Sequence, residues 1–183
     1  MNLKLNAKQL RKESAKFKIR PSKLRKNEIY IILDNVLDTY NIGSIFRLAD
    51  AVAAKKIYLC GGTETPPNPR IKKASINTTE WVDWEYKETA VEVIEDLRGK
   101  VKEIQIIAIE QSDKSVRYDK FEYKYPLALV VGHESEGVSK EVLEMVDAVV
   151  ELPMFGVNIS LNVMVSLAIV LYEVIKRTRI PSK

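Results

Sequence analysis

The 183-residue chain has the length and composition of one globular domain, with 46% hydrophobic and 30% charged residues. Its only cysteine, Cys60, excludes an intramolecular disulfide, and a single histidine leaves no Cys/His set for a zinc site. We therefore expect a cytoplasmic protein that folds around its own apolar core and needs no metal.

Positive charge is concentrated at the N-terminus. Residues 1–26 contain ten Lys and Arg residues and one acid, a net charge of +9, which leaves −5 of the total +4 for residues 27–183. Such a block is either a solvated tail or an arm that binds phosphates, and a basic arm on an acidic body suits a polyanionic partner. It lacks the apolar core of a signal peptide. We divide the chain into a basic N-terminal arm, 1–26, and a domain, 27–183.

The domain alternates between strand and helix patterns. Apolar runs predict strands at 30–36, 56–62, 81–86, 103–110, 126–134 and 148–154, several of them apolar throughout, as buried parallel strands are. Helical periodicity predicts helices at 41–54, 89–99 and 139–147, the last with Ser139 as its N-cap. The proline-rich segment 61–70 is predicted to be a surface loop. This alternation predicts an α/β fold with a mainly parallel sheet flanked by helices.

The last apolar segment is uncharged from residue 152 to residue 172. Turn-forming and polar residues interrupt it before the helical pattern begins: Pro153, Gly156, Asn158, Ser160 and Asn162. These residues argue against a membrane span, so none is expected. The helix predicted at 163–175 is apolar on nearly all sides and should be buried on all sides.

Three junctions after predicted strands have unusual sequences. Ligands of open parallel sheets bind beyond the carboxyl ends of the strands, where this chain has "DNVLDTYNIGSIFRLAD" (34–50), "GHESEGVS" (132–139) and "MFGVNISLN" (154–162). Neither G-x-G-x-x-G nor G-x-x-x-x-G-K-[ST] is present, which argues against dinucleotide-binding and P-loop proteins. His133 lies only two residues from Ser135, too close along the chain for an easily aimed Ser/His pair, so we interpret it as a loop residue.

Glycines at these junctions indicate either tight turns or places where a ligand approaches the backbone, namely Gly132, Gly137 and Gly156. Their position on loops at one edge of the sheet favours a shared pocket. Its apolar walls would be Leu152, Met154 and Leu161, which suit an adenosine better than a charged metabolite.

The three segments 41–51, 129–139 and 151–173 together resemble, in order and spacing, the three motifs of the SpoU (TrmH-like) branch of the SPOUT RNA methyltransferases. The resemblance covers about residues 29–176. It implies an α/β knot, in which the C-terminal part of the chain threads a deep trefoil, and a homodimer through the last helix. It further implies methyl transfer from S-adenosylmethionine to a ribose 2′-hydroxyl of transfer or ribosomal RNA, with no metal. The compact architecture resembles the enzymes that methylate guanosine in the D-loop of transfer RNA.

The same resemblance assigns the site residues. The catalytic set is Asn41, Arg47, Glu134, Ser160 and Asn162. Since arginine stays protonated, Arg47 is expected to grip a phosphate and orient the ribose rather than act as a base. Glu134 would hold Arg47 or Asn41 in place. Ser160 and Asn162 would meet the ribose or phosphate, although Ser160 could simply cap the helix.

The remaining candidates bind the cofactor and the RNA. The cofactor residues are expected to be Glu110, Gly132, Leu152, Met154, Gly156 and Leu161. The RNA-binding residues are expected to be Lys16, Lys18, Arg20, Lys23 and Arg25 of the arm, with Arg70, Lys72 and Lys73 on the proline-rich loop. Two other hypotheses remain: a catalytically silent RNA-binding relative, and an α/β protein that binds another adenine-containing ligand.

Overall fold

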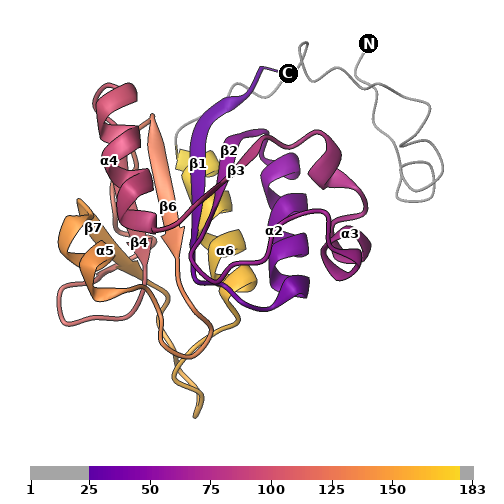
Figure 1. Ribbon diagram of the computed structural model, residues 1–183. Coiled ribbons are helices and arrows are strands. Elements are labelled where there is room, and N and C mark those ends of the chain that lie inside the picture. Colours follow the sequence, from indigo (N-terminus) through magenta and orange to yellow (C-terminus); the bar gives the residue numbers. More distant parts are fainter. Residues whose placement is uncertain (1–24, 178–183) are drawn as a thin grey trace.

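A computed structural model describes residues 25–177 of the chain and shows a central sheet with helices on both faces (Figure 1). The expectations for Lys16, Lys18, Arg20 and Lys23 lie outside the described residues. The elements in chain order are β1 (Asn27–Asp34), α2 (Thr39–Ala51), β2 (Ala54–Cys60), α3 (Pro69–Ser75), the 3₁₀ helix η2 (Thr78–Glu80), β3 (Trp84–Lys87), α4 (Ala90–Lys100), β4 (Gln105–Ile109), β5 (Val116–Arg117), β6 (Leu127–Val131), α5 (Lys140–Met145), β7 (Ala148–Glu151) and α6 (Val163–Arg177).

The sheet is parallel, as the sequence predicted. Its strand order is β3-β2-β1-β6-β4-β7-β5, and all of these neighbours pair in parallel. Ile31 of β1, for example, is aligned with Ile57 of β2 and with Leu129 of β6. The order reverses direction beside β1, and open parallel sheets bind ligands at such a switch point.

Three elements were not predicted, namely β5, α3 and the short 3₁₀ helix η2. β5 is two exposed residues long, so it has no apolar run to reveal it. α3 begins inside the segment that was predicted to be a loop, because the Asn68 side chain accepts hydrogen bonds from Arg70 N at 2.8 Å and Ile71 N at 3.2 Å and Pro69 occupies the first helical position. The proline that suggested a loop is therefore a helix start.

The α5 start also differs from its prediction. Ser139 is the N-cap residue, but its side chain makes no capping hydrogen bond. Its backbone N–H instead donates to Oδ2 of the buried Asp34 at 2.8 Å. The start of α5 is thus attached to the end of β1.

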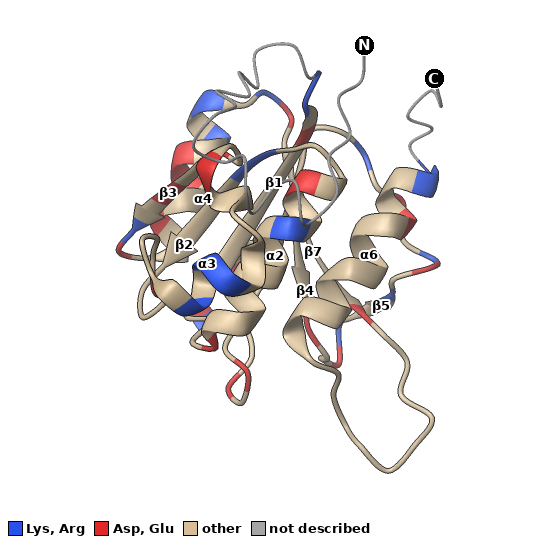
Figure 2. Ribbon diagram, turned by 90° about the vertical axis from the view of Figure 1, so that its right-hand side faces the viewer, with Lys and Arg blue, Asp and Glu red and all other residues tan. Residues whose placement is uncertain are grey.

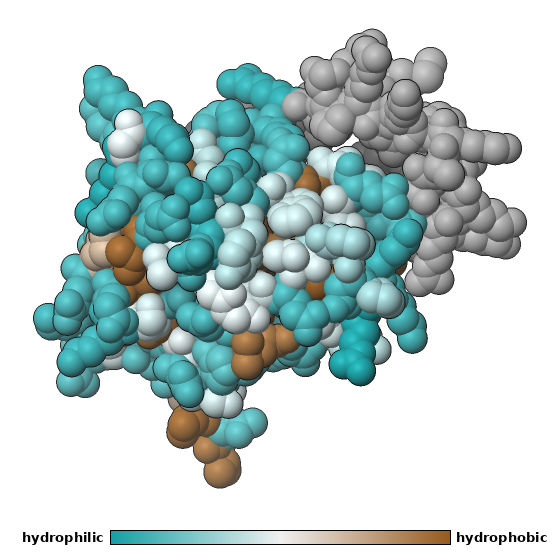
Figure 3. Space-filling view, in the orientation of Figure 1, coloured by the Kyte–Doolittle hydropathy of each residue, from teal (hydrophilic) through white to brown (hydrophobic). Residues whose placement is uncertain are grey.

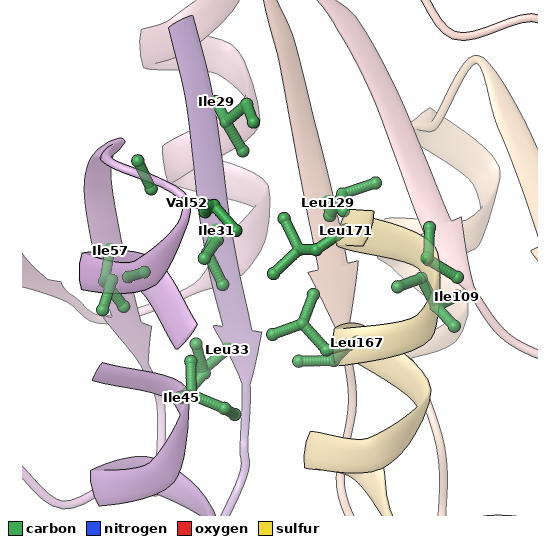
Figure 4. Packing of buried hydrophobic residues seen from close by; sticks show 14 of the residues in the cluster. Ile29, Ile31, Leu33, Ile45, Val52, Ile57, Ile109, Leu129, Leu167 and Leu171 are labelled. Carbon is green, nitrogen blue, oxygen red and sulfur yellow. The ribbon is translucent and has the colours of Figure 1, made fainter. Parts of the chain in front are cut away.

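The helices form two layers, because alternate residues of each strand face opposite sides of the sheet. Ile31 and Leu33 of β1 pack with α2, α3 and α6, whereas Ile32 packs with α4 and α5. Figure 4 shows Leu167 and Leu171 of α6 directed toward the first of these cores. The motif helices α2 and α6 therefore share one face of the sheet.

The C-terminal helix is buried on one side only. Its buried residues are Leu167, Val170, Leu171 and Val174. Val165 and Tyr172 are exposed, with relative accessibilities of 37% and 54%, so the single chain buries one side of α6 and burial of the other side by a dimer partner stays a prediction. No helix within residues 25–177 combines the length and apolar character needed to cross a bilayer.

Cys60 is a core residue at the end of β2. Its side chain is fully buried, and this burial raises the pKa of the thiol to about 12. Because the thiolate is the reactive form, the residue is unreactive at neutral pH and contributes by packing.

The close packing of α2 on α3 depends on Gly43. A Cβ atom at this position would lie 2.6 Å from Cβ of Ala74 and 2.7 Å from the carbonyl oxygen of Ile71. Even a methyl group would therefore force α3 away from α2.

We expect Gly43→Ala to destabilise the protein by about 1–3 kcal/mol, because overpacking forces a backbone shift. The matched control is Gly99→Ala in α4, where an added Cβ meets nothing within 4 Å. Urea unfolding of both variants measures the effect. Equal stability of Gly43→Ala and the wild type would contradict this packing argument.

Candidate active site

The three motif loops meet at the carboxyl edge of the sheet. They are the β1–α2 connection, the loop 132–139 that follows β6, and the loop 152–162 that precedes α6. In Figure 1 they lie together at the lower end of the molecule. Hydrogen bonds between residues about a hundred positions apart join them.

Glu134 joins the loop after β6 to the start of α2. Its Oε1 accepts hydrogen bonds from Asp38 N at 2.9 Å and from Asn41 Nδ2 at 3.0 Å. Its Oε2 accepts from Leu37 N at 3.1 Å. Asp38 in turn caps α2 by accepting from Tyr40 N at 2.7 Å. One carboxylate therefore fixes both the backbone before α2 and the side chain of Asn41, as the sequence predicted for Asn41.

Asn162 extends this group to α6. Its Nδ2 donates to Oδ1 of Asn41 at 3.0 Å, and its Oδ1 accepts from Met164 N at 3.0 Å and Val165 N at 3.3 Å. Asn162 therefore caps α6. The alternative that Ser160 caps the helix is wrong, since Ser160 is exposed and makes no such bond.

The hydrogen bonds favour the charged form of Glu134. Partial burial by itself raises the pKa of this carboxyl, but donation from Asp38 N, the Asn41 amide and Leu37 N outweighs it. The net result is a pKa below the ordinary value of 4.5. Glu134 is thus a carboxylate, suited to holding other groups in place.

Arg47 lies outside this hydrogen-bonded group. Asn41 is 6% exposed, whereas Arg47 is exposed. Six residues correspond to about 600° of helix rotation, which places Arg47 roughly 240° around α2 from Asn41. Within residues 25–177 no hydrogen bond or ion pair holds its guanidinium. Asn41 and Arg47 therefore lie on different sides of α2.

The glycines of the loop 132–139 allow it to pack on itself. His133 N and Gly137 O are 2.9 Å apart, as are Gly137 N and His133 O. A Cβ at Gly132 would lie 2.1 Å from the Gly137 carbonyl, and Gly137 has a φ of 74°. Both glycines are therefore required by the loop itself. His133 is a loop residue, as predicted, and its Nδ1 accepts from Ser135 N at 3.1 Å.

Glu110 connects the end of β4 to the same loop. Its Oε2 accepts from Val138 N at 2.9 Å and its Oε1 from Gln111 N at 2.9 Å. The Gln111 side chain donates to Ile159 O at 2.6 Å. The end of β4 thus contacts two of the three motif loops.

The loop before α6 extends away from the body of the protein (Figure 2). Leu152 and Met154 are half-buried, but Gly156 and Leu161 are exposed and a Cβ at Gly156 would meet nothing within 4 Å. Apolar side chains cover the loop, with Phe155, Val157 and Ile159 at least 80% exposed. They form the hydrophobic protrusion at the lower end of Figure 3. The single chain therefore does not close an apolar pocket around Gly156 and Leu161.

The candidate RNA-binding residues within the described range are exposed. They are Arg25, which precedes β1, and Arg70, Lys72 and Lys73, which lie on α3 rather than on a loop. Figure 2 shows the basic positions of α2 and α3 on the same side of the molecule.

The lowered pKa of Glu134 predicts a pH-dependent stability difference. Because the folded state lowers this pKa, the stabilisation is present above 4.5 and is lost as the pH falls through the folded value. We expect Glu134→Gln to be about 1 kcal/mol less stable than the wild type at pH 7 and the difference to shrink at pH 3.5.

Urea unfolding at the two pH values measures this difference. The control is Glu136→Gln, because Glu136 is exposed and its carboxylate makes no hydrogen bond within residues 25–177. A Glu134→Gln difference that is the same at both pH values would argue against a stabilising carboxylate.

Known proteins match both the sequence and the fold. A tRNA (guanosine(18)-2′-O)-methyltransferase of Aquifex aeolicus is 34% identical over 151 residues, 81% of this chain and 69% of that protein. The crystal structure of an A. aeolicus TrmH/SpoU tRNA modifying enzyme has a TM-score of 0.77 and 29% identity, covering 94% of this chain and 82% of that one.

A second structure contains a bound ligand. The AdoMet-bound rRNA methyltransferase of Sinorhizobium meliloti has a TM-score of 0.73 and 29% identity, over 83% of this chain and 57% of that chain. Residues 28–172, which include nearly all of β1, all three motif loops and most of α6, match the SpoU rRNA Methylase family. The resemblance of the three motifs is thereby confirmed, and this chain belongs to the SpoU family.

Proposed function

We propose that this protein is an RNA methyltransferase that transfers a methyl group from S-adenosylmethionine to a ribose 2′-hydroxyl. The observation that carries the proposal is the chain of hydrogen bonds from Glu134 through Asn41 to Asn162, which joins the three motifs at the carboxyl edge of the sheet. Membership of the SpoU family supports the same activity. The reaction takes place in the cytoplasm, where RNA is available to a basic protein.

The preferred substrate is a guanosine in the D-loop of transfer RNA. The A. aeolicus relative named for transfer RNA guanosine methylation is 34% identical to this chain. The S. meliloti protein, named an rRNA methyltransferase, is 29% identical to this chain, and the match covers only 57% of the S. meliloti chain. Ribosomal RNA is therefore the second substrate to test.

The cofactor residues lie around the loops that meet at the carboxyl edge. S-adenosylmethionine supplies a reactive methyl group on a sulfonium centre. Glu110, beside the loop 132–139, can accept a hydrogen bond from a ribose hydroxyl, since each of its oxygens has one protein donor and a free lone pair. The half-buried Leu152 and Met154 offer apolar contact to an adenine. These residues fit the cofactor.

The remaining cofactor candidates depend on how the loop before α6 is arranged. Gly132 brings the loop backbone together, while Gly156 and Leu161 are exposed. We propose that the loop folds over the adenosine when the cofactor binds, which would remove its apolar side chains from water. The trefoil knot that the resemblance implies would hold this loop near the cofactor, and it stays a prediction.

Catalysis then rests on positioning. Asn41 and Asn162 place amide groups beside the reacting ribose, and Ser160 offers a hydroxyl on the adjoining loop. Glu134 is a positioning residue, since its carboxylate acts through Asn41. Arg47 grips a phosphate of the RNA, and its exposed guanidinium, which no group within residues 25–177 binds, suits that task.

RNA is bound by basic residues on the α2–α3 side and by the arm. Arg70, Lys72 and Lys73 present their charges beside α2, to which α3 is closely packed at Gly43. Arg25 stands at the start of β1, and residues 1–26 add a net charge of +9. Phosphate contacts of this kind give affinity without reading the base sequence.

The active form is a homodimer through α6. Val165 and Tyr172 leave an apolar strip on the outer face of the helix, and the loop 154–161 adds further apolar side chains at its start. Such surfaces are covered in stable proteins, and a second copy would cover them. Analytical ultracentrifugation should give twice the mass of the chain, and a stable monomer at micromolar concentration would contradict the assembly.

Transfer of a radiolabelled methyl group from S-adenosylmethionine tests the function. We expect label to enter unmodified transfer RNA and, after nuclease digestion, to appear in a 2′-O-methylguanosine. Label in ribosomal RNA alone would show that the substrate is ribosomal RNA and not transfer RNA. No label in either pool, with cofactor and RNA still bound, would favour a catalytically silent RNA-binding relative.

Two Arg47 variants separate its role from cofactor binding. Arg47→Ala should abolish transfer while leaving the Kd for S-adenosylmethionine nearly unchanged, because Arg47 is exposed and away from the Asn41 group. Arg47→Lys keeps the charge but loses the planar fork and should recover only part of the activity. A loss of cofactor affinity as large as the loss of transfer would count against a role on the RNA side.

A further inference from the structure

One face of α2 carries an exposed aromatic side chain in line with Arg47. Tyr40 and Arg47 are seven residues apart, so they lie within about 20° of each other around the helix and roughly 10 Å apart along it. Both are exposed, whereas Asn41 between them points inward. Tyr40 therefore belongs to the face that carries the phosphate-gripping arginine of the proposed function.

Hydrogen bonds fix the backbone of Tyr40, and its aromatic ring is partly exposed to solvent. Its backbone N–H donates to the Asp38 side chain at 2.7 Å, and Asp38 N donates to Glu134 at 2.9 Å. Its side chain is 52% exposed, and within residues 25–177 it makes no hydrogen bond and no contact with another aromatic ring. The structure thus leaves part of an aromatic side chain exposed to water next to Asn41.

We propose that Tyr40 is a platform on which a base of the RNA stacks, next to the ribose that receives the methyl group. This inference rests on the proposed function. Proteins recognise RNA mostly through unstacked bases, which they hold on exposed aromatic rings. The stacked base is uncharged and has two flat faces, so the interaction positions the nucleotide without selecting its identity.

The charges along α2 give the bound strand a direction. The start of the helix carries the carboxylates of Asp38 and Glu134, which repel phosphates and leave room for a neutral base. Arg47, two turns further along, attracts a phosphate. The basic residues of α3 lie on the same side (Figure 2). The RNA backbone therefore runs from the start of α2 toward Arg47 and α3.

The test compares Tyr40→Phe, which keeps the ring, with Tyr40→Ala, which removes it. The control is Tyr86→Ala, which removes another exposed tyrosine, 45% accessible, from β3. Binding of a fluorescently labelled, unmodified transfer RNA transcript is measured by anisotropy, and methyl transfer to the same transcript gives kcat and KM.

For Tyr40→Ala we expect a roughly ten-fold rise in the Kd for RNA and in KM, as the loss of one stacked base implies. Tyr40→Phe and Tyr86→Ala should stay within about two-fold of the wild type. The kcat values and the Kd for S-adenosylmethionine should change little, because the Asn41 and Asn162 amides bond to each other and Asn41 bonds to Glu134, without the Tyr40 side chain.

Three results would overturn the proposal. Unchanged RNA binding and KM in Tyr40→Ala would show that no base stacks there, while transfer by the wild type would leave the proposed function intact. Equal weakening in Tyr40→Phe and Tyr40→Ala would assign the effect to the hydroxyl. Dissociation of a dimer by Tyr40→Ala would assign the ring to a subunit contact. A different pair of results would separate the two proposals. If the wild type transfers no methyl group but Tyr40→Ala still binds RNA more weakly than the wild type, the stacking platform is supported and the methyltransferase activity is rejected.

Discussion

The carboxylate of Glu134 determines the geometry of the site. It accepts three N–H groups from a segment 93 to 97 residues earlier in the chain, and these contacts exist because β1 and β6 pair in parallel with their carboxyl ends together. The start of α2 and the Asn41 side chain are both fixed by this one group. Asn162 then binds the oriented Asn41 and caps α6, so both motif helices of one sheet face are aligned through a single carboxylate.

The hydrogen-bonded group also explains why polar residues stand at the start of the most apolar helix. A buried amide is costly unless its donors and acceptors are satisfied. Asn41 is almost fully buried, and both ends of its amide have partners, Glu134 on one side and Asn162 on the other. The polar cluster is therefore compatible with the apolar core directly behind it, where Leu167 packs.

Much of the fold could be predicted because β1, β4 and β6 are covered on both faces, which produces continuous apolar runs. α3 was missed because a proline can end a helix or begin one, and the capping geometry of Asn68 decides which. Likewise, Ser160 and Asn162 are both good cap residues, and the choice between them depends on Asn41, which is 121 positions away. The separation of Arg47 from Asn41 around α2 could have been computed from the helical repeat, since it needs no tertiary information.

The proposed site uses two faces of α2, and this arrangement would limit where RNA can react. Its inner face holds Asn41 in contact with Glu134 and Asn162, and its outer face carries Arg47. If Arg47 binds a phosphate of the RNA on the outer face, the ribose that is methylated would have to pass around the first turn of α2 to reach the Asn41 and Asn162 amides. Tyr40 and Asn41 are consecutive there, about 100° apart, so the two faces adjoin at this turn. A base stacked on Tyr40 would hold its nucleotide at this turn, where the ribose lies next to Asn41.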